Sequence, residues 1–81
     1  MELQLKIVSP QRVEFQGLVE NVLVPGTLGQ FEILKGHAPL ISSLANGTVV
    51  YNDAEGSHSI EITGGFVEVQ KNQVSVCAEL V

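Results

Sequence analysis

The sequence is poor in the residues that bind sugars and nucleic acids. It has no tryptophan and one tyrosine among 81 residues, which argues against the aromatic stacking platforms of carbohydrate-binding and base-binding domains. Four lysines and arginines are scattered against nine acids, for a net charge of −5. A phosphate-binding surface needs clustered bases, so we expect no nucleic-acid partner.

Disulfides, membrane spans and export signals are also missing. Cys77 is the only cysteine, so it cannot form an internal disulfide. The opening Met-Glu-Leu-Gln-Leu-Lys lacks the basic start and apolar core of a signal peptide. No apolar run approaches the roughly 18 to 20 residues of a membrane span. We expect no direct insertion into a membrane, so any contact with one would go through another protein.

What the sequence does contain is enough apolar residues for one core. Apolar residues make up 44% of the chain and charged residues only 16%, the reverse of a disordered balance. The length fits a single domain over residues 1–81. A chain of this size typically has a free energy of unfolding of about 5 kcal/mol, so binding to a larger partner would add to its rigidity.

Apolar and polar residues alternate through most of the chain, which is typical of half-buried strands. Turn residues such as Pro25-Gly26, Asn46-Gly47 and Lys71-Asn72 separate the alternating segments. No stretch has a helical period. The sequence therefore predicts an all-β fold, an antiparallel β-sandwich or flattened barrel of about eight to ten short strands. The predicted strands are 3–7, 12–16, 18–24, 29–34, 40–44, 48–52, 57–63, 66–70 and 73–80, with 18–24 in the interior and Gly64-Gly65 as a bulge or close backbone contact.

Side chains suited to catalysis are few. Cys77 is in a strand, on the face opposite Val74 and Val76, and His58 precedes an alternating strand, so both are interpreted as structural. Two histidines and one cysteine do not have zinc spacing, and we expect no metal, cofactor or catalytic residue. The glutamates fall mainly on polar positions, as on a solvated face: Glu14, Glu20, Glu32, Glu61, Glu68 and Glu79.

His37 differs because Gly36 and Pro39 restrict the loop on both sides. Two interpretations stay open for it. Its ring either hydrogen-bonds its own loop or is held in place for a partner.

Several segments, in order along the chain, resemble the ε subunit of bacterial F-type ATP synthases. The most specific are the Gly-His-Ala-Pro-Leu loop at 36–40 and the Gly-Gly-Phe-Val-Glu-Val strand at 64–69. The others are Gly17-Leu18-Val19-Glu20, Val24-Pro25-Gly26, Gly29-Gln30-Phe31, Gly47 with the strand that follows it, Ile62-Thr63 and Asn72 to Val76. The resemblance runs from about Leu5 to Ala78 and covers the N-terminal β-sandwich of the family. It does not extend to the C-terminal helical hairpin that many members carry.

The resemblance implies a non-catalytic subunit at the foot of the rotating central stalk. Such a subunit contacts the γ subunit and the polar loops of the membrane c-ring, and couples c-ring rotation to γ during ATP synthesis. It implies a peripheral location on the cytoplasmic face of the bacterial inner membrane. The implied partner-binding residues are Gly29, Gln30, Phe31, His37, Ala38 and Pro39. Gln30 departs from relatives that carry an acid there, so a salt bridge to the ring is not expected.

Two other functions remain open from the residues alone. One is a small β-sandwich module, unrelated to ATP synthase, that binds a ligand or a protein. The other is an enzyme that depends on His37 or Cys77. Neither has a motif of its own in the sequence.

Overall fold

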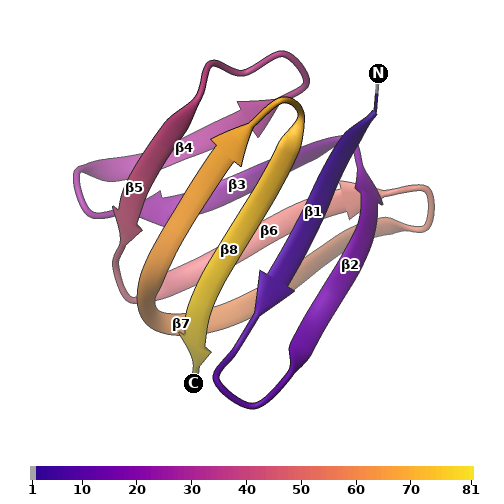
Figure 1. The fold of residues 1–81 in the computed structure, drawn as a ribbon. Helices are drawn as coiled ribbons and strands as arrows, with labels where there is room; N and C mark the ends of the chain where they lie inside the picture. Colours follow the sequence, from indigo (N-terminus) through magenta and orange to yellow (C-terminus); the bar gives the residue numbers. More distant parts are fainter. Residues whose placement is uncertain (1) are drawn as a thin grey trace.

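A computed structural model describes residues 2–81, which form eight strands and no helix (Figure 1). No helix in this range is therefore available to cross a membrane. The all-β prediction is confirmed. The strands are β1 (Leu3–Val8), β2 (Val13–Val19), β3 (Asn21–Gly26), β4 (Gly29–Leu34), β5 (Leu40–Leu44), β6 (Gly47–Asp53), β7 (Gly56–Gln70) and β8 (Gln73–Leu80).

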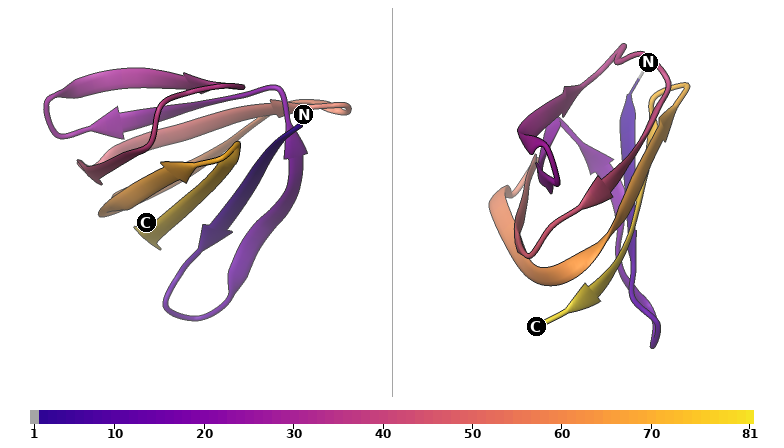
Figure 2. Two further views of the ribbon diagram at one scale, coloured as in Figure 1. Left: turned by 45° about the horizontal axis from the view of Figure 1, so that its top comes forward. Right: turned by 90° about the vertical axis from the view of Figure 1, so that its left-hand side faces the viewer.

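The strands form two layers that face each other across the core (Figure 2). One layer carries β2, β1, β8, the second half of β7 and β5; the other carries β4, β3, β6 and the first half of β7. The long strand β7 bends from one layer into the other and so joins them (Figure 1). The start of β1 and the end of β8 lie at opposite ends of the sandwich.

One strand pair departs from the antiparallel prediction. β1 pairs with β8 in parallel, from Gln4 opposite Gln73 to Val8 opposite Cys77. Neighbouring strands along a chain are usually antiparallel because a short turn connects them, but β1 and β8 are the first and last strands and no turn constrains them. The sheet is therefore mixed.

Two predicted boundaries also differ. The predicted strand 18–24 is divided at Glu20, and Leu18, expected inside, is 49% exposed. Conversely, the predicted strands 57–63 and 66–70 are one strand, β7, with a shift in its pairing between Ile62 and Gly64. Apolar content alone marks neither the break nor the bend.

The core lies between the layers and consists of the inward side chains of alternating strands. Its largest fully buried members are Leu3, Leu5, Ile7, Val22, Val24, Ile33, Val49, Ile62, Val67, Val69, Val74 and Val76. The predicted turn at Lys71-Asn72 is confirmed. Both residues have positive φ (53° and 60°), the backbone that a two-residue hairpin with the right twist requires.

Candidate partner-binding site

The first group of predicted contact residues surrounds the turn between β3 and β4. Gly26 pairs with Gly29, leaving Thr27 and Leu28 at the tip, where Leu28 is fully exposed. Gln30 is exposed on β4, one residue beyond the turn. Phe31 is only half-buried and packs beside Gly26 against the core. Gln30 is therefore available to a partner, while the Phe31 ring helps to fix the turn.

The second group forms the loop between β4 and β5. The backbone N–H of His37 donates to the carbonyl of Leu34 (3.1 Å), and His37 Nδ1 lies 2.8 Å from the carbonyl oxygen of Ala38. His37 is half-buried, and both of these bonds lie within its own loop. This agrees with one of the two interpretations of the residue. Ala38 and Pro39 are exposed.

Asn72 holds this loop in place, although the sequence did not single it out as a site residue. Its side-chain oxygen accepts the backbone N–H of Gly36 (2.7 Å), and its own carbonyl accepts the N–H of Gln4 (2.9 Å). One residue of the β7–β8 turn therefore fixes the loop and the start of β1. The available signal was an asparagine at a turn position, since asparagine tolerates positive φ.

The two groups lie at opposite ends of β4. The six residues of that strand separate them by roughly 17 Å at the usual rise per residue. In Figure 1 the β3–β4 turn stands at the left and the β4–β5 loop passes over the top. The predicted residues therefore lie in two groups joined by a strand, rather than in one compact patch.

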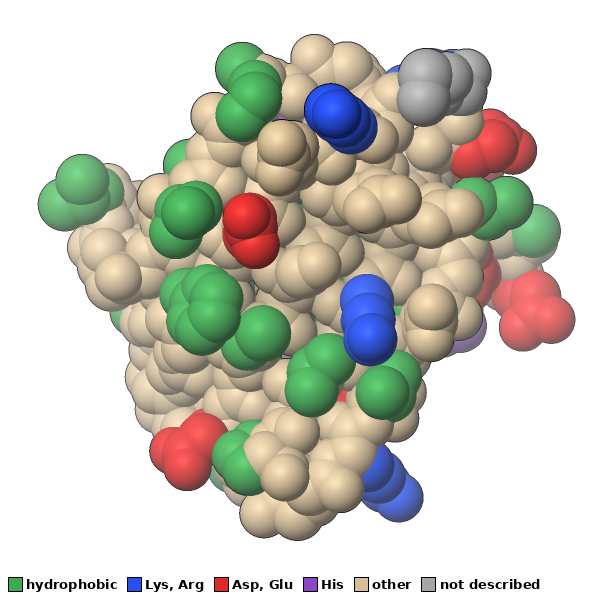
Figure 3. All heavy atoms as spheres, in the orientation of Figure 1, with side chains coloured by type: hydrophobic (Ala, Val, Ile, Leu, Met, Phe, Trp, Pro, Cys, Tyr) green, Lys and Arg blue, Asp and Glu red, His purple; other side chains and the backbone are tan. Residues whose placement is uncertain are grey.

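A band of apolar side chains crosses the outer face of the other layer (Figure 3). The strand register aligns Phe66 with Cys77, Cys77 with Val8, and Val8 with Val13. Phe66 and Val13 are about half-exposed, and Cys77 faces away from the core as predicted. An open hollow of about 550 Å³ next to this band is lined by Phe66 as its one aromatic residue, which is too little aromatic surface for sugar or base stacking.

The second histidine takes part in a small cluster at the β6–β7 hairpin. His58 Nε2 lies 2.9 Å from Asp53 Oδ1, and its ring stacks on Tyr51, which in turn packs on Phe15. The N–H of Glu55 donates to Asp53, and this bond, with the His58 contact, holds the pKa of Asp53 below its ordinary value against the opposing effect of burial. The cluster closes the hairpin, consistent with a structural His58.

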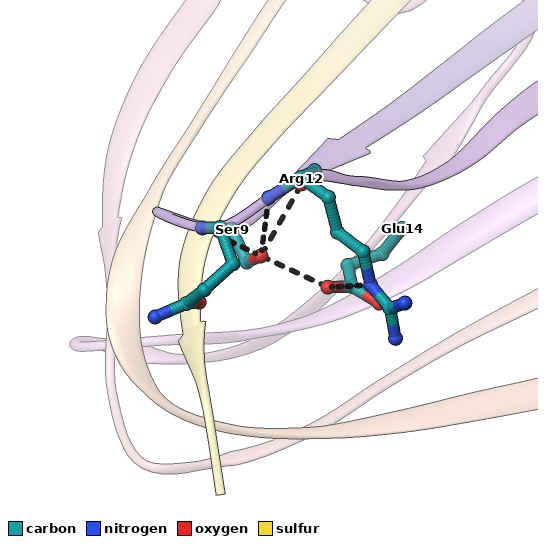
Figure 4. A network of polar contacts seen from close by, with 4 residues as sticks. Ser9, Arg12 and Glu14 are labelled. Carbon is teal, nitrogen blue, oxygen red and sulfur yellow. Dashed lines mark hydrogen bonds and ion pairs between the residues drawn. The ribbon is translucent and has the colours of Figure 1, made fainter.

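A second polar network shapes the loop between β1 and β2 (Figure 4). The buried Ser9 hydroxyl lies 2.9 Å from Glu14 Oε2, and Arg12 Nε lies 3.2 Å from the same oxygen. The Ser9 bond comes first among the causes that lower the pKa of Glu14, and Arg12 adds to it. The backbone N–H of Arg12 also donates to Ser9 Oγ, so the network fixes the loop.

Among residues 2–81, no three histidine, cysteine, aspartate or glutamate side chains lie together as metal ligands. His37 and His58 lie in different loops, and Cys77 lies on the outer face of β8. The candidate site therefore consists of the two predicted groups of residues at the ends of β4.

Comparison with known proteins identifies the family of this chain. Residues 2–81 match the family described as ATP synthase, Delta/Epsilon chain, beta-sandwich domain. The ATP synthase epsilon chain of Leptospira borgpetersenii is 36% identical over 96% of this chain and 61% of its own length. The epsilon chain of Chlorobium limicola is 43% identical over 94% of this chain and 88% of its own length. The chain thus spans about three fifths of the Leptospira relative and most of the Chlorobium one.

Solved structures share the fold. A chain in the Euglena gracilis mitochondrial ATP synthase structure of OSCP, F1 and c-ring superposes with a TM-score of 0.88 at 21% identity, over 95% of this chain and 50% of that one. A chain of the Tetrahymena thermophila central stalk and c-ring structure gives 0.80 at 15% identity, over 98% and 64%. At these identities the likeness is one of fold. With the sequence match over residues 2–81, the chain belongs to the family of the ATP synthase delta/epsilon chain β-sandwich domain.

Proposed function

We propose that this domain is a non-catalytic subunit of the central stalk of a proton-translocating F-type ATP synthase. It binds the γ subunit and the polar loops of the c-ring and couples rotation of the ring to γ. The observation that carries the proposal is the family match over residues 2–81. The fold neighbours support it, since both come from ATP synthase assemblies that include the c-ring.

The fold suits a part that must transmit torque. Ladders of main-chain hydrogen bonds run through both layers, and β7 belongs to both, so the layers cannot slide without breaking pairs. A fully buried apolar core fills the space between them. Such a body resists deformation because closely packed interiors have low compressibility.

The proposed contacts with the rotor are the two ends of β4. Gln30 beside the β3–β4 turn, and Ala38 and Pro39 in the β4–β5 loop, offer exposed side chains. Gly29 and Phe31 shape the turn, and His37 shapes the loop. Because Gln30 is uncharged, its contact with the ring is a hydrogen bond or van der Waals packing. The domain stays peripheral on the cytoplasmic face of the bacterial membrane, held there by the ring and γ.

Cysteine cross-linking in the assembled enzyme tests this orientation. In a Cys77→Ala background, Gln30→Cys should form a disulfide with cysteines introduced in the c-ring loops. Ala54→Cys, exposed at the β6–β7 turn on another side of the sandwich, is the matched control and should not. Equal cross-linking from both positions, or from neither, would contradict the proposed orientation.

A further inference from the structure

The outer face of the β2–β1–β8–β7–β5 layer carries two rows of side chains that cross its strands. The first row is the apolar band of Figure 3, formed by Phe66, Cys77, Val8 and Val13. The second row lies two residues away along the strands, where Glu68 and Lys6 stand on either side of Ser75. This face therefore combines apolar surface that is open to water with one acid and one base.

The acid and the base of the second row have no partner among residues 2–81. The side chains of Lys6 and Glu68 are exposed, and neither joins an ion pair in that part of the chain. Ser75 separates them, so their backbones lie two strand spacings apart, about 10 Å. Each charge is therefore available to an opposite charge on another molecule.

A two-fold axis along β8 makes this face complementary to itself. In the strand order β7 and β1 are the neighbours of β8. An axis along β8, in the plane between two copies, therefore places β7 of one copy over β1 of the other. Phe66 then lies over Val8, and Glu68 lies over Lys6. Both contacts occur twice, because in a two-fold interface the residue pair is repeated in reverse.

An axis across the strands does not give this match. It reverses the direction of β8 and places β7 over its own copy. Either Glu68 then meets Glu68, or the apolar band meets the charged row. Like charges in an interface, and charges held against apolar side chains, both cost free energy. The two rows therefore favour the axis along β8, in which the strands of the two packed sheets run nearly parallel.

The size of the face sets the strength of such an interface. Strands about 4.8 Å apart and about 20 Å long give the layer of β2, β1, β8, β7 and β5 a face of roughly 500 Å², or roughly 1,000 Å² over two copies. Specific interfaces begin near this area, and those at the low end are weak and transient. We therefore expect a reversible association.

We propose that two copies of the free chain associate through this face, about the two-fold axis along β8. A second copy is the occupant because its apolar row meets an apolar row and its charges meet opposite charges. Association removes the half-exposed Phe66 and Val13 side chains from water, which favours the dimer. The dimer goes beyond the proposed function and does not rest on it.

Charge exchange in the free chain tests the interface by sedimentation equilibrium at low ionic strength. The unaltered chain should dimerise with a dissociation constant of about 10–100 µM. Lys6→Glu brings four acids together, and Glu68→Lys brings four bases together, so each should weaken the dimer roughly fivefold. The double variant Lys6→Glu/Glu68→Lys restores opposite charges in both contacts. Its affinity should return to within about twofold of the unaltered chain.

Lys35→Glu is the matched control for net charge. Lys35 is exposed just after β4, in the other layer, so this variant should keep the affinity within about twofold. An equal loss in Lys35→Glu and Lys6→Glu, or no recovery in the double variant, would overturn the proposed face. A chain that stays monomeric at about 500 µM would overturn the association itself and leave the band to another partner.

Glu79 provides a check of the opposite sign. It is exposed near the end of β8, on the same side as Cys77, so the axis brings the two Glu79 side chains toward each other. Glu79→Gln should therefore strengthen the dimer roughly twofold at low ionic strength and have no effect near 1 M salt, where charges are screened. Glu55→Gln, the same change at the exposed β6–β7 turn, should not strengthen it. Equal effects of the two variants would contradict the axis along β8.

Discussion

Replacing Gly65 by alanine adds only one methyl group, yet among changes of that size it should lower the free energy of unfolding most. Its φ of +151° disfavours any side chain, and a Cβ there would lie 2.1 Å from the carbonyl oxygen of Cys77 and 2.7 Å from the Cα of Ala78. Both atoms belong to the backbone of β8, so no side-chain rotation relieves the clash. Gly64 next to it is different, because its Cβ would meet only the carbonyl of Leu44, at 3.6 Å.

The magnitude follows from two effects. Holding a residue in a disfavoured backbone region costs about 1–3 kcal/mol, and forcing an extra methyl group against the backbone of β8 costs about another 1–3 kcal/mol. Gly65→Ala should therefore lower the free energy of unfolding by about 4 kcal/mol, most of the roughly 5 kcal/mol expected for the chain. At about 4–8 °C per kcal/mol, the midpoint should fall by about 15–30 °C.

Urea unfolding followed by circular dichroism measures both variants. Gly64→Ala should change the free energy of unfolding by less than about 1 kcal/mol, since it removes only glycine's excess freedom in the unfolded chain. Should the two alanine variants agree within 1 kcal/mol, the close approach of β7 to β8 at Gly65 would be refuted.

Three further outcomes follow from the same structure. Asn72→Gly keeps the positive φ but removes the acceptor for Gly36, so the Gly36 amide should exchange roughly tenfold faster. Asn72→Asp should keep it protected, and identical Gly36 exchange in both variants would refute the contact. The folded-state pKa of Asp53 is lowered, so its stabilisation is fully present above the unfolded value near pH 4 and is lost as pH falls through the folded value. Asp53→Asn should therefore flatten the loss of stability below about pH 4, and an unchanged acid limb in pH-dependent unfolding would contradict this. Ile62→Ala opens a cavity in the core and should destabilise by about 2–5 kcal/mol in urea unfolding, whereas Ile41→Ala, 73% exposed, should cost well under 1 kcal/mol; similar losses at both would contradict the assigned core.

The sequence predicted the elements of the fold well where alternation and turn chemistry agreed. The segments 29–34 and 40–44 match β4 and β5, and the turn at Lys71-Asn72 is where it was expected. Each of these features depends on residues close together in the chain. Local patterns therefore carried most of the secondary structure.

Features that depend on distant residues were not predictable in the same way. The parallel pairing of β1 with β8 joins the two ends of the chain, and no local pattern encodes it. The continuity of β7 through Gly64-Gly65 depends on β8 lying against Gly65, so the glycines were interpreted as punctuation between strands. The predicted close backbone contact is nevertheless present, at Gly65.

The local geometry of the predicted contact residues followed from the sequence more than their arrangement in space did. The loop at 36–39 was correctly expected to be restricted, and the own-loop bond of His37 was one of its two interpretations. The role of Asn72 in holding that loop spans 36 residues of sequence and came only from the fold. The separation of the two groups by β4 likewise depends on strand direction, which the sequence pattern does not contain.

Co-purification with γ tests the central claim most directly. Co-expressed with γ and purified through a tag on γ alone, this chain should elute as a stoichiometric complex in size-exclusion chromatography. The Gly65→Ala variant, left with a free energy of unfolding of only about 1 kcal/mol, should be recovered in that complex at a lower yield. Elution of the folded chain as a separate species, at concentrations well above the micromolar range, would contradict its assignment to the central stalk.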